Sequence, residues 1–185
     1  MHPYSQIIAL REAGAVQRTH TRTIFGEYTI AGHSWNALNL LFLLWPEEDD
    51  PPSLQLIIAI AWHDIAERWT GDVPAPTKWI SPTLKNTLDI LEQKVLRALE
   101  LHHPFVCLSS KEKSWLKGVD TLELYLWSKE QAQVGNNTVL DMQQRILSYV
   151  KEHQELYPKE ILDCFQNLFW ERVPEIDDLL PKENI

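Results

Sequence analysis

Apolar residues in this chain recur every three or four positions, the spacing that places them along one face of an α-helix. Residues 82–102 show the pattern most clearly, with Leu84, Leu88, Leu91 and Val95 on one stripe. Alternation with a period of two, which is typical of half-buried strands, is scarce, and no Asn-Gly pair marks a hairpin. The periodicity therefore predicts an all-α fold, a single helical bundle.

Proline and serine residues indicate where several of these helices end and begin. Pro46 stops one apolar helix, and Ser53 is a candidate N-cap for the next. Neither internal repeats nor a long linker divide the chain, so we expect residues 1–185 to form one domain with a frayed tail at 174–185. About seven helices are expected, at residues 4–13, 34–45, 54–69, 82–102, 111–134, 139–157 and 159–172.

The segment 16–32 interrupts this helical pattern. It lacks helical periodicity, and it contains Arg18, His20 and Arg22. A connection of this length inside a compact domain is uncommon and is often functional. We therefore expect it to contribute to a binding site.

The charge and cysteine content exclude several classes of protein. An excess of 26 acidic over 17 basic residues gives a net charge of −9, which disfavours a nucleic acid polymer as partner because such binding depends on cationic contacts. A small anionic ligand needs only a few local basic groups. No apolar stretch reaches the roughly 20 residues that span a bilayer, so no membrane partner is expected. Cys107 and Cys164 form no CxxC pair and no secretory signal is recognisable, which favours the cytoplasm, or the host cytoplasm for a phage-encoded chain.

Three polar side chains interrupt the most apolar of the expected helices. His63, Asp64 and Glu67 follow directly on the run LIIAIAW, and the apolar residues of this helix surround its axis. Burying such groups without partners costs several kcal/mol. In a continuous helix Glu67 lies one turn from the other two. A bound cation or an internal hydrogen-bond network would account for the cluster.

Two further residues could complete a metal site. His33 stands at the start of an apolar helix, and Asp120 lies among apolar residues in another. Together with His63 and Asp64 they form a ligand set that would bind a first-row divalent cation and leave positions open for water. We therefore expect one divalent metal ion, and Co, Mn, Mg or Zn would each be compatible with these ligands.

The residues around His63 carry a family resemblance. The ligand pattern resembles that of the HD-domain metal-dependent phosphohydrolases. The stretch HDIAERWTGDVPAPTKW at 63–79 resembles the HDxxExxTGDxPxPxK signature of the YfbR-like 5′-deoxynucleotidases and the related cyanophage dATP triphosphohydrolases. Arg18 ahead of the first histidine and GNN at 135–137 are similar as well, and the resemblance covers about residues 5–150.

The resemblance implies a role for each matching residue. The metal ligands would be His33, His63, Asp64 and Asp120. Glu67 would act on the attacking water as a general base, or would donate a proton to the leaving oxygen. The residues implied in catalytic or binding contacts to the substrate are Arg18, Thr19, Arg22, Asp72, Pro76 and Lys78.

These substrate contacts would divide between phosphate and sugar. Arg18 and Lys78 would contact phosphate oxygens and stabilise the charge that develops in the reaction. Asp72 resembles the carboxylate that accepts the sugar 3′-hydroxyl, which favours deoxyribose. Pro76 would stiffen its loop, so that a ligand does not have to order it. Arg22 would suit the outer phosphates of a triphosphate.

Two positions depart from the family pattern. Gly32 stands where a glutamate usually precedes the first histidine, so a supporting contact is either missing or relocated. Thr19 stands where several relatives have a tryptophan of the base pocket, and His20 and Thr21 could compensate. The resemblance therefore does not extend to the base preference.

The resemblance implies an enzyme that attacks the 5′ α-phosphorus of a deoxynucleotide, its small-molecule partner. Short intervals between the motifs favour the phage type, a triphosphohydrolase that releases deoxynucleoside and triphosphate, over a 5′-deoxynucleotidase that hydrolyses a monophosphate. A non-catalytic HD scaffold that binds a nucleotide is an alternative. A cyclic-nucleotide phosphodiesterase is another, although that branch lacks the TGDxPxPxK stretch. Relatives are homo-oligomers, so we expect a dimer or a higher assembly.

Overall fold

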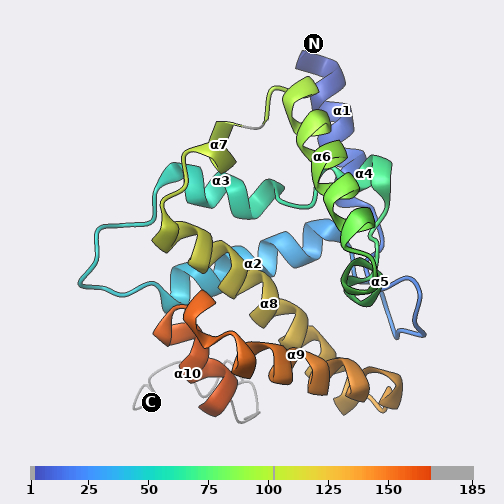
Figure 1. The fold of residues 1–185 in the computed structure, drawn as a ribbon, viewed down its shortest axis with the longest axis vertical. Helices are drawn as coiled ribbons and strands as arrows, with labels where there is room; N and C mark the ends of the chain where they lie inside the picture. Colours follow the sequence, from blue (N-terminus) through green and yellow to red (C-terminus); the bar gives the residue numbers. More distant parts are fainter. Residues whose placement is uncertain (1–2, 102, 168–185) are drawn as a thin grey trace, which may run out of the picture.

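The regular secondary structure in the described part of the chain is helical, apart from one isolated bridge between Gln17 and Thr29. The structure is a computed structural model that describes residues 3–101 and 103–167, except for the side chain of residue 79 (Figure 1). The all-α expectation is confirmed. Within these residues the structure has ten α-helices and two 3-10 helices, more than the seven expected, because several of them are single turns in connections.

The helices follow one another in the order given in Figure 1. Their bounds are α1 Pro3–Gly14, α2 Ile30–Leu44, α3 Leu54–Trp62, α4 Glu67–Thr70, α5 Ala75–Ile80, α6 Pro82–Ala98, α7 His103–Val106, α8 Ser110–Gln133, η1 Asn137–Val139, α9 Leu140–Glu152, η2 Gln154–Leu156 and α10 Lys159–Asn167.

Helix α8 is the centre of the bundle. It packs against α2, α3, α9 and α10, while α1 and α6 stand side by side at the other end of the molecule (Figure 1). The core between the central helices is apolar and fully buried, with Leu41 from α2, Leu56 from α3, Trp115 and Leu122 from α8 and Ile161 from α10. This arrangement brings α2, the end of α3 and the middle of α8 together.

Helix 54–69, expected to be continuous, is broken at His63. Helix α3 ends at Trp62 and α4 begins at Glu67. The His63 imidazole bonds through Nδ1 to the Ile60 carbonyl (2.8 Å), which is the acceptor that the Asp64 N–H would use in a continuing helix. The chain passes into tighter turns, such as Glu67 N to Asp64 O at 2.9 Å. Because the helix is interrupted, His63, Asp64 and Glu67 do not lie on one continuous helix as expected.

Other boundaries differ by a few residues. Helix α2 begins at Ile30, where the Thr29 side chain accepts the Gly32 N–H, so His33 lies within its first turn and not at its start. Helix α6 ends at Ala98, short of the expected 102. Expected helical residues beyond 167 and the tail at 174–185 lie outside the described residues. No helix among the described residues has the length and apolarity needed to cross a membrane.

Candidate active site

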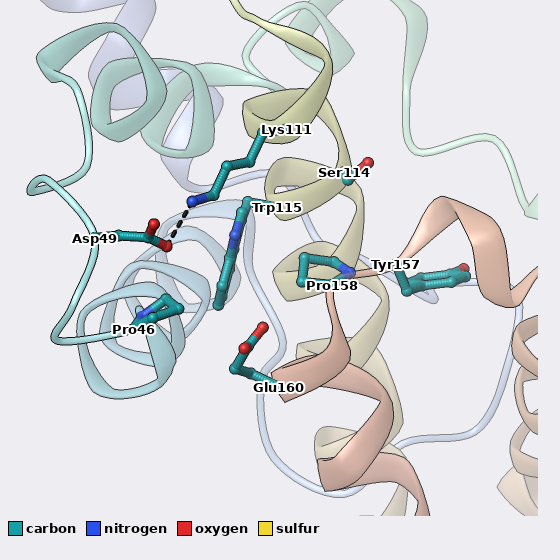
Figure 2. A pocket seen from close by; sticks show the side chains of 8 residues that line it. All are labelled: Pro46, Asp49, Lys111, Ser114, Trp115, Tyr157, Pro158 and Glu160. Carbon is teal, nitrogen blue, oxygen red and sulfur yellow. Dashed lines mark hydrogen bonds and ion pairs between the residues drawn. The ribbon is translucent and has the colours of Figure 1, made fainter.

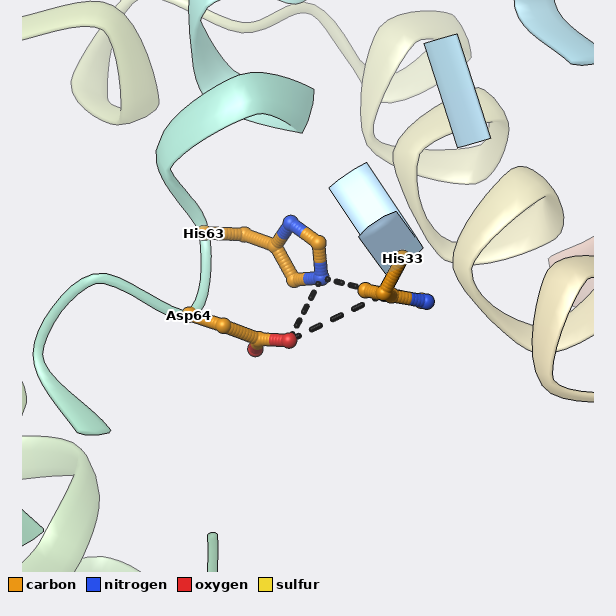
Figure 3. Close-up of side chains that lie close together, drawn as sticks. All are labelled: His33, His63 and Asp64. Carbon is orange, nitrogen blue, oxygen red and sulfur yellow. Dashed lines mark hydrogen bonds and ion pairs between the residues drawn. The ribbon is translucent and has the colours of Figure 1, made fainter. Parts of the chain in front are cut away.

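Four predicted metal ligands converge where α2, the end of α3 and α8 meet. The Nε2 atoms of His33 and His63 lie 3.2 Å apart (Figure 3). One oxygen of Asp64 lies 3.1 Å from His63 Nε2 and 3.7 Å from His33 Nε2. One oxygen of Asp120 lies 3.2 Å from His33 Nε2 and 3.6 Å from His63 Nε2. Donor atoms from residues far apart in the sequence thus face one point.

The spacing of these donor atoms suits a small cation. Ligand atoms about 2.1 Å from a tetrahedral ion lie roughly 3.4 Å from one another. The separations between the two histidines, and between each histidine and each carboxylate, run from 3.1 to 3.7 Å. The ligand atoms of His33, His63 and Asp64 all lie within 4.8 Å of one another, and Asp120 is outside that tighter group. Imidazoles and carboxylates match the nitrogen and oxygen donors that first-row divalent metals take. His33, His63 and Asp64 therefore fit a single divalent ion, with Asp120 next to both histidines.

Both histidines are oriented to present Nε2 to the cluster. The Nδ1 of His63 bonds to the backbone carbonyl of Ile60, and the Nδ1 of His33 bonds to the Glu123 carboxylate. Because a carbonyl or a carboxylate accepts a hydrogen bond, each Nδ1 is the donor in its contact, and each Nε2 is the nitrogen that faces the cluster. Nε2 is therefore the atom that each histidine would offer to a metal.

The charges in the cluster are strongly linked. Burial disfavours a proton on His63, but the neighbouring Asp64 and Asp120 outweigh it and raise the pKa of His63 well above its ordinary value. Burial also works against charge on Asp64, yet His63 and Arg18 hold its pKa well below the ordinary range. Acidic and basic groups of the cluster thus stabilise one another in their charged forms.

Arg18 is buried against this cluster. Its Nη1 donates to Asp64 Oδ2, and its Nη2 lies 3.9 Å from Asp120 Oδ1. Burial opposes its charge, but Asp64, together with Tyr28, Asp120 and Glu67, outweighs burial and raises the pKa of Arg18 well above its ordinary value. Its Nε is buried without a hydrogen-bond partner among the described residues. A fixed positive charge with an unused donor therefore borders the point where the donor atoms meet.

Glu67 is a buried carboxyl with an unused oxygen. It begins α4, and its Oε2 has no hydrogen-bond partner in the described part of the chain. Burial and then the nearby Asp64 raise the pKa of Glu67 to about 9. Perturbed acids of this kind gather at functional sites, where they exchange protons with a substrate or a water.

Asp72 ties together the two loops beside the cluster. Its Oδ2 accepts the backbone N–H of Thr19 at 2.7 Å. Thr19 adopts a φ of +53°, a left-handed conformation that is uncommon for a β-branched residue, and its hydroxyl donates to the Arg18 carbonyl at 2.7 Å. The carboxylate thus fixes the turn that carries Arg18.

Pro76 and Lys78 lie in the short helix α5, which follows the Asp72 loop. Burial raises the pKa of Glu92 on α6, and the charge of Lys78 partly offsets this increase. The same ammonium also opposes the raised pKa of Glu67. Lys78 therefore faces the acidic side of the site.

Arg22 is the predicted residue that the structure directs elsewhere. Its guanidinium donates to both oxygens of Asp141, at 2.8 and 3.0 Å, and to the Thr138 carbonyl at 2.6 Å. These contacts hold it against η1 and α9. Its contact with outer phosphates stays a prediction that would require it to leave Asp141.

Sequence reasoning missed Glu123 and Tyr28. Glu123 follows Asp120 by three residues on α8, so both carboxyls share a helix face. Its carboxylate accepts the Tyr28 hydroxyl at 2.5 Å as well as His33 Nδ1. Tyr28 stacks on Trp127 and lies 5.6 Å below the Arg18 guanidinium. The detectable signal was a glutamate in the apolar stretch VDTLELYLW.

The loop 16–29 is fastened to the end of α8. Gln131 bonds to both the N–H and the carbonyl of Phe25, each at 2.8 Å. Asn136, in the GNN stretch, donates to the Thr23 carbonyl and to Gln131 Oε1, each at 2.9 Å. This gives a physical role to the asparagine of that motif, which is to hold the loop that carries Arg18.

A separate cavity of about 320 Å³ lies between the end of α2, the start of α8 and α10 (Figure 2). Asp49 and Lys111 pair across it at 2.5 Å, and Trp115 and Glu160 line it. None of its lining residues belongs to the histidine and aspartate cluster. The cavity is therefore distinct from the predicted metal site.

Comparisons with known proteins identify the family of the chain. Residues 7–173 match the family model described as 5′-deoxynucleotidase YfbR-like. The 5′-deoxynucleotidases of Yersinia pestis strain Pestoides F and Yersinia pseudotuberculosis strain YPIII are each 32% identical over 104 residues, which is 50% of this chain and 53% of theirs. The chain thus spans about half the length of the curated relatives it matches.

Solved structures share the fold. The cyanophage S-2L HD phosphohydrolase DatZ, bound to dA and one catalytic Zn²⁺ ion, matches with a TM-score of 0.68 and 21% identity over 90% of this chain and 92% of its own. The PH0347 protein of Pyrococcus horikoshii OT3 matches with a TM-score of 0.69 and 16% identity over 89% and 96%. The helical arrangement is therefore one that is known from other proteins.

Proposed function

We propose, because this chain belongs to the YfbR-like 5′-deoxynucleotidase family, that it is a metal-dependent hydrolase of deoxynucleotides. The observation that supports this proposal is the convergence of His33, His63, Asp64 and Asp120 on one point, with Arg18 and Glu67 beside them. Each of these six residues also matches the family motif.

The four ligands would hold one divalent ion, which in the DatZ structure is Zn²⁺. Such an ion supplies Lewis acidity, which lowers the pKa of water and polarises the phosphoryl group. The identity of the ion is open among Co, Mn, Mg and Zn, since nitrogen and carboxylate donors accept each of them.

The protein residues would then bind, orient and move protons. Water oxygen forms a bond to the 5′ phosphorus while the bond from phosphorus to the 5′-oxygen breaks. Glu67 would take a proton from the water and pass it to the departing 5′-oxygen, or its carboxyl would donate a proton to that oxygen while the water releases its own proton to solvent. Arg18 and Lys78 contact the phosphate oxygens and stabilise the charge that grows on them. Asp72 has a second oxygen to accept a 3′-hydroxyl of the sugar.

The substrate that these basic side chains suit best is a deoxynucleoside 5′-monophosphate. Arg18 and Lys78 are enough for a single phosphate. A triphosphate needs further positive charge, and Arg22, the residue expected to supply it, is engaged by Asp141. The triphosphohydrolase reaction is the second candidate, and the phage DatZ neighbour is the observation that favours it.

One assay separates the two reactions. Purified protein is incubated with dAMP or dATP in the presence of Co²⁺, Mn²⁺ or Mg²⁺, and the products are identified. Phosphate and deoxyadenosine from dAMP would support the nucleotidase, whereas inorganic triphosphate from dATP would support the triphosphohydrolase. An Arg22→Ala variant should leave dAMP hydrolysis unchanged and weaken dATP hydrolysis only if that arginine reaches the outer phosphates.

The same assay tests the alternative of a non-catalytic scaffold. A scaffold binds nucleotide without metal and tolerates Glu67→Gln. Failure to hydrolyse the mono- and triphosphates of all four deoxynucleosides with every metal tried would refute the enzymatic proposal.

We also propose that the protein forms a homo-oligomer. Leu43 on α2 and Ile80 on α5 are 79% and 87% exposed, and an interface between copies of the chain would cover apolar side chains of this kind. Light scattering coupled to gel filtration should give at least twice the 21.6 kDa mass of the chain. A monomer over the micromolar range would contradict this expectation.

A further inference from the structure

Glu123 is the most deeply buried acidic group near the metal cluster, and it is not among the predicted ligands. It is 2% exposed in the middle of α8. Burying a carboxylate this deeply is costly unless its oxygens are hydrogen-bonded. Three groups meet this requirement: His33 Nδ1 and the Tyr28 hydroxyl bond to Oε2, and Asn36 Nδ2 lies 3.3 Å from Oε1.

The geometry of these contacts connects Glu123 to the metal-binding face of His33. The imidazole has two nitrogens, and the one that faces Glu123 is on the opposite side of the ring from the one that faces His63 and Asp120. A carboxylate that accepts the Nδ1 proton holds the tautomer, fixes the plane of the ring and makes Nε2 a stronger donor to a metal. The Nδ1 of His63, by contrast, contacts the Ile60 carbonyl, which is a neutral acceptor.

Glu123 also provides a support for His33 that residue 32 does not provide. Gly32 precedes His33 at the position where the family resemblance implies a glutamate, and a glycine offers no side chain to support that histidine. Glu123 reaches His33 from a different helix, α8, which also carries Asp120 one turn earlier. One helix thus supplies a ligand and the support for another ligand.

We propose that Glu123, fixed by Tyr28 and Asn36, is a positioning residue that sets His33 for metal binding. This inference depends on the proposed function only in taking the cluster to hold a divalent ion. A carboxylate that served only the stability of the core would leave metal affinity unchanged when replaced by a neutral group of the same shape. The same replacement of a positioning carboxylate would lower the metal affinity.

The test compares Glu123→Gln with Glu130→Gln, which makes the same chemical change at an exposed position two turns along α8. The dissociation constant for Co²⁺ is measured by calorimetry on each metal-free protein, and circular dichroism checks that each is folded. Loss of a hydrogen-bond partner of a metal-binding histidine typically weakens binding 10- to 100-fold. We expect a change of that size for Glu123→Gln and less than about 2-fold for Glu130→Gln, an exposed site.

Each outcome is informative. Equal Co²⁺ affinity in the two variants would overturn the inference while leaving the proposed function intact. If the wild-type protein itself bound neither Co²⁺ nor Zn²⁺, the proposed function would fail first.

A measurement on the wild-type protein tests whether Glu123 accepts the Nδ1 proton of His33, even if Glu123→Gln does not fold. Long-range proton–nitrogen NMR spectra of the Zn²⁺-loaded wild type report which nitrogen of His33 carries the proton, and a His33→Gln sample identifies the signal. We expect the proton on Nδ1 and the metal at Nε2. The opposite assignment would rule out a role for Glu123 as acceptor.

Discussion

Replacing Glu67 by glutamine should stabilise the metal-free protein at neutral pH and at the same time remove its activity. The carboxyl is buried, its Oε2 lacks a partner among the described residues, and burial followed by the charge of Asp64 raises its pKa from 4.5 to about 9. An acid with a raised pKa in the folded state favours folding when protonated. Its contribution is complete below pH 4.5 and is lost progressively as the pH rises toward 9.

The magnitude follows from these two values. One pKa unit corresponds to about 1.4 kcal/mol, so between pH 4.5 and pH 7 the wild-type protein loses about 3 kcal/mol of unfolding free energy at this residue. Glutamine has the shape and neutrality of the protonated carboxyl and does not titrate. The two proteins should therefore be equally stable near pH 4.5 and differ by about 3 kcal/mol at pH 7, or roughly 6–12 °C in Tm for a domain of this size.

The assay is urea or thermal unfolding in the presence of EDTA across this pH range, with the difference between the two proteins plotted against pH. Taking the difference removes the titrations of the other cluster residues. Glu155→Gln, a change at an exposed glutamate, is the matched control and should give a flat difference curve. With metal and substrate added, Glu67→Gln should lower kcat about 10²–10⁴-fold, the usual contribution of an acid or base. A wild-type protein as stable as the variant at pH 7 would refute the reasoning.

Three further substitutions test other parts of the structure. Asp120→Asn should weaken Co²⁺ binding by at least about 100-fold in calorimetry, because a direct ligand matters more than its hydrogen-bond partners do; retained affinity would remove Asp120 from the ligand set. Ser109→Ala breaks the capping box with Glu112 at the start of α8, and should lower the unfolding free energy by about 1 kcal/mol without changing kcat. Gln131→Ala removes both partly buried hydrogen bonds to Phe25 and should cost about 1–3 kcal/mol by urea unfolding. Because the loop it anchors carries Arg18, kcat/KM should fall as well; an unchanged kcat/KM would show that the anchor is not needed to place that arginine.

The class of fold and the family could be predicted from the sequence because each depends on local patterns. Apolar spacings of three and four predicted the helices, and the described residues confirm an all-α chain. The stretch from His63 to Lys78 predicted the YfbR-like family, and the family model confirms it. Both signals come from contiguous residues and require no knowledge of the packing.

What the sequence could not provide depends on side-chain contacts that the apolar pattern does not show. One of them is local: the break in helix 54–69 comes with the contact of the His63 side chain to the Ile60 carbonyl. The others join distant segments. Glu123 looked like an ordinary glutamate until α8 was placed beside α2. Arg22 looked like a phosphate ligand, and only the position of α9 showed Asp141 within reach.

Two of the predicted ligands and two of the predicted substrate contacts belong to different kinds of structure. His33 and Asp120 lie within long packed helices, whereas Thr19 and Asp72 lie in loops. Loops tolerate substitution far better than packed helices do. Substitutions at Thr19 or Asp72 should therefore change the proposed substrate contacts and the placement of Arg18, while the helices that hold His33 and Asp120 keep their packing.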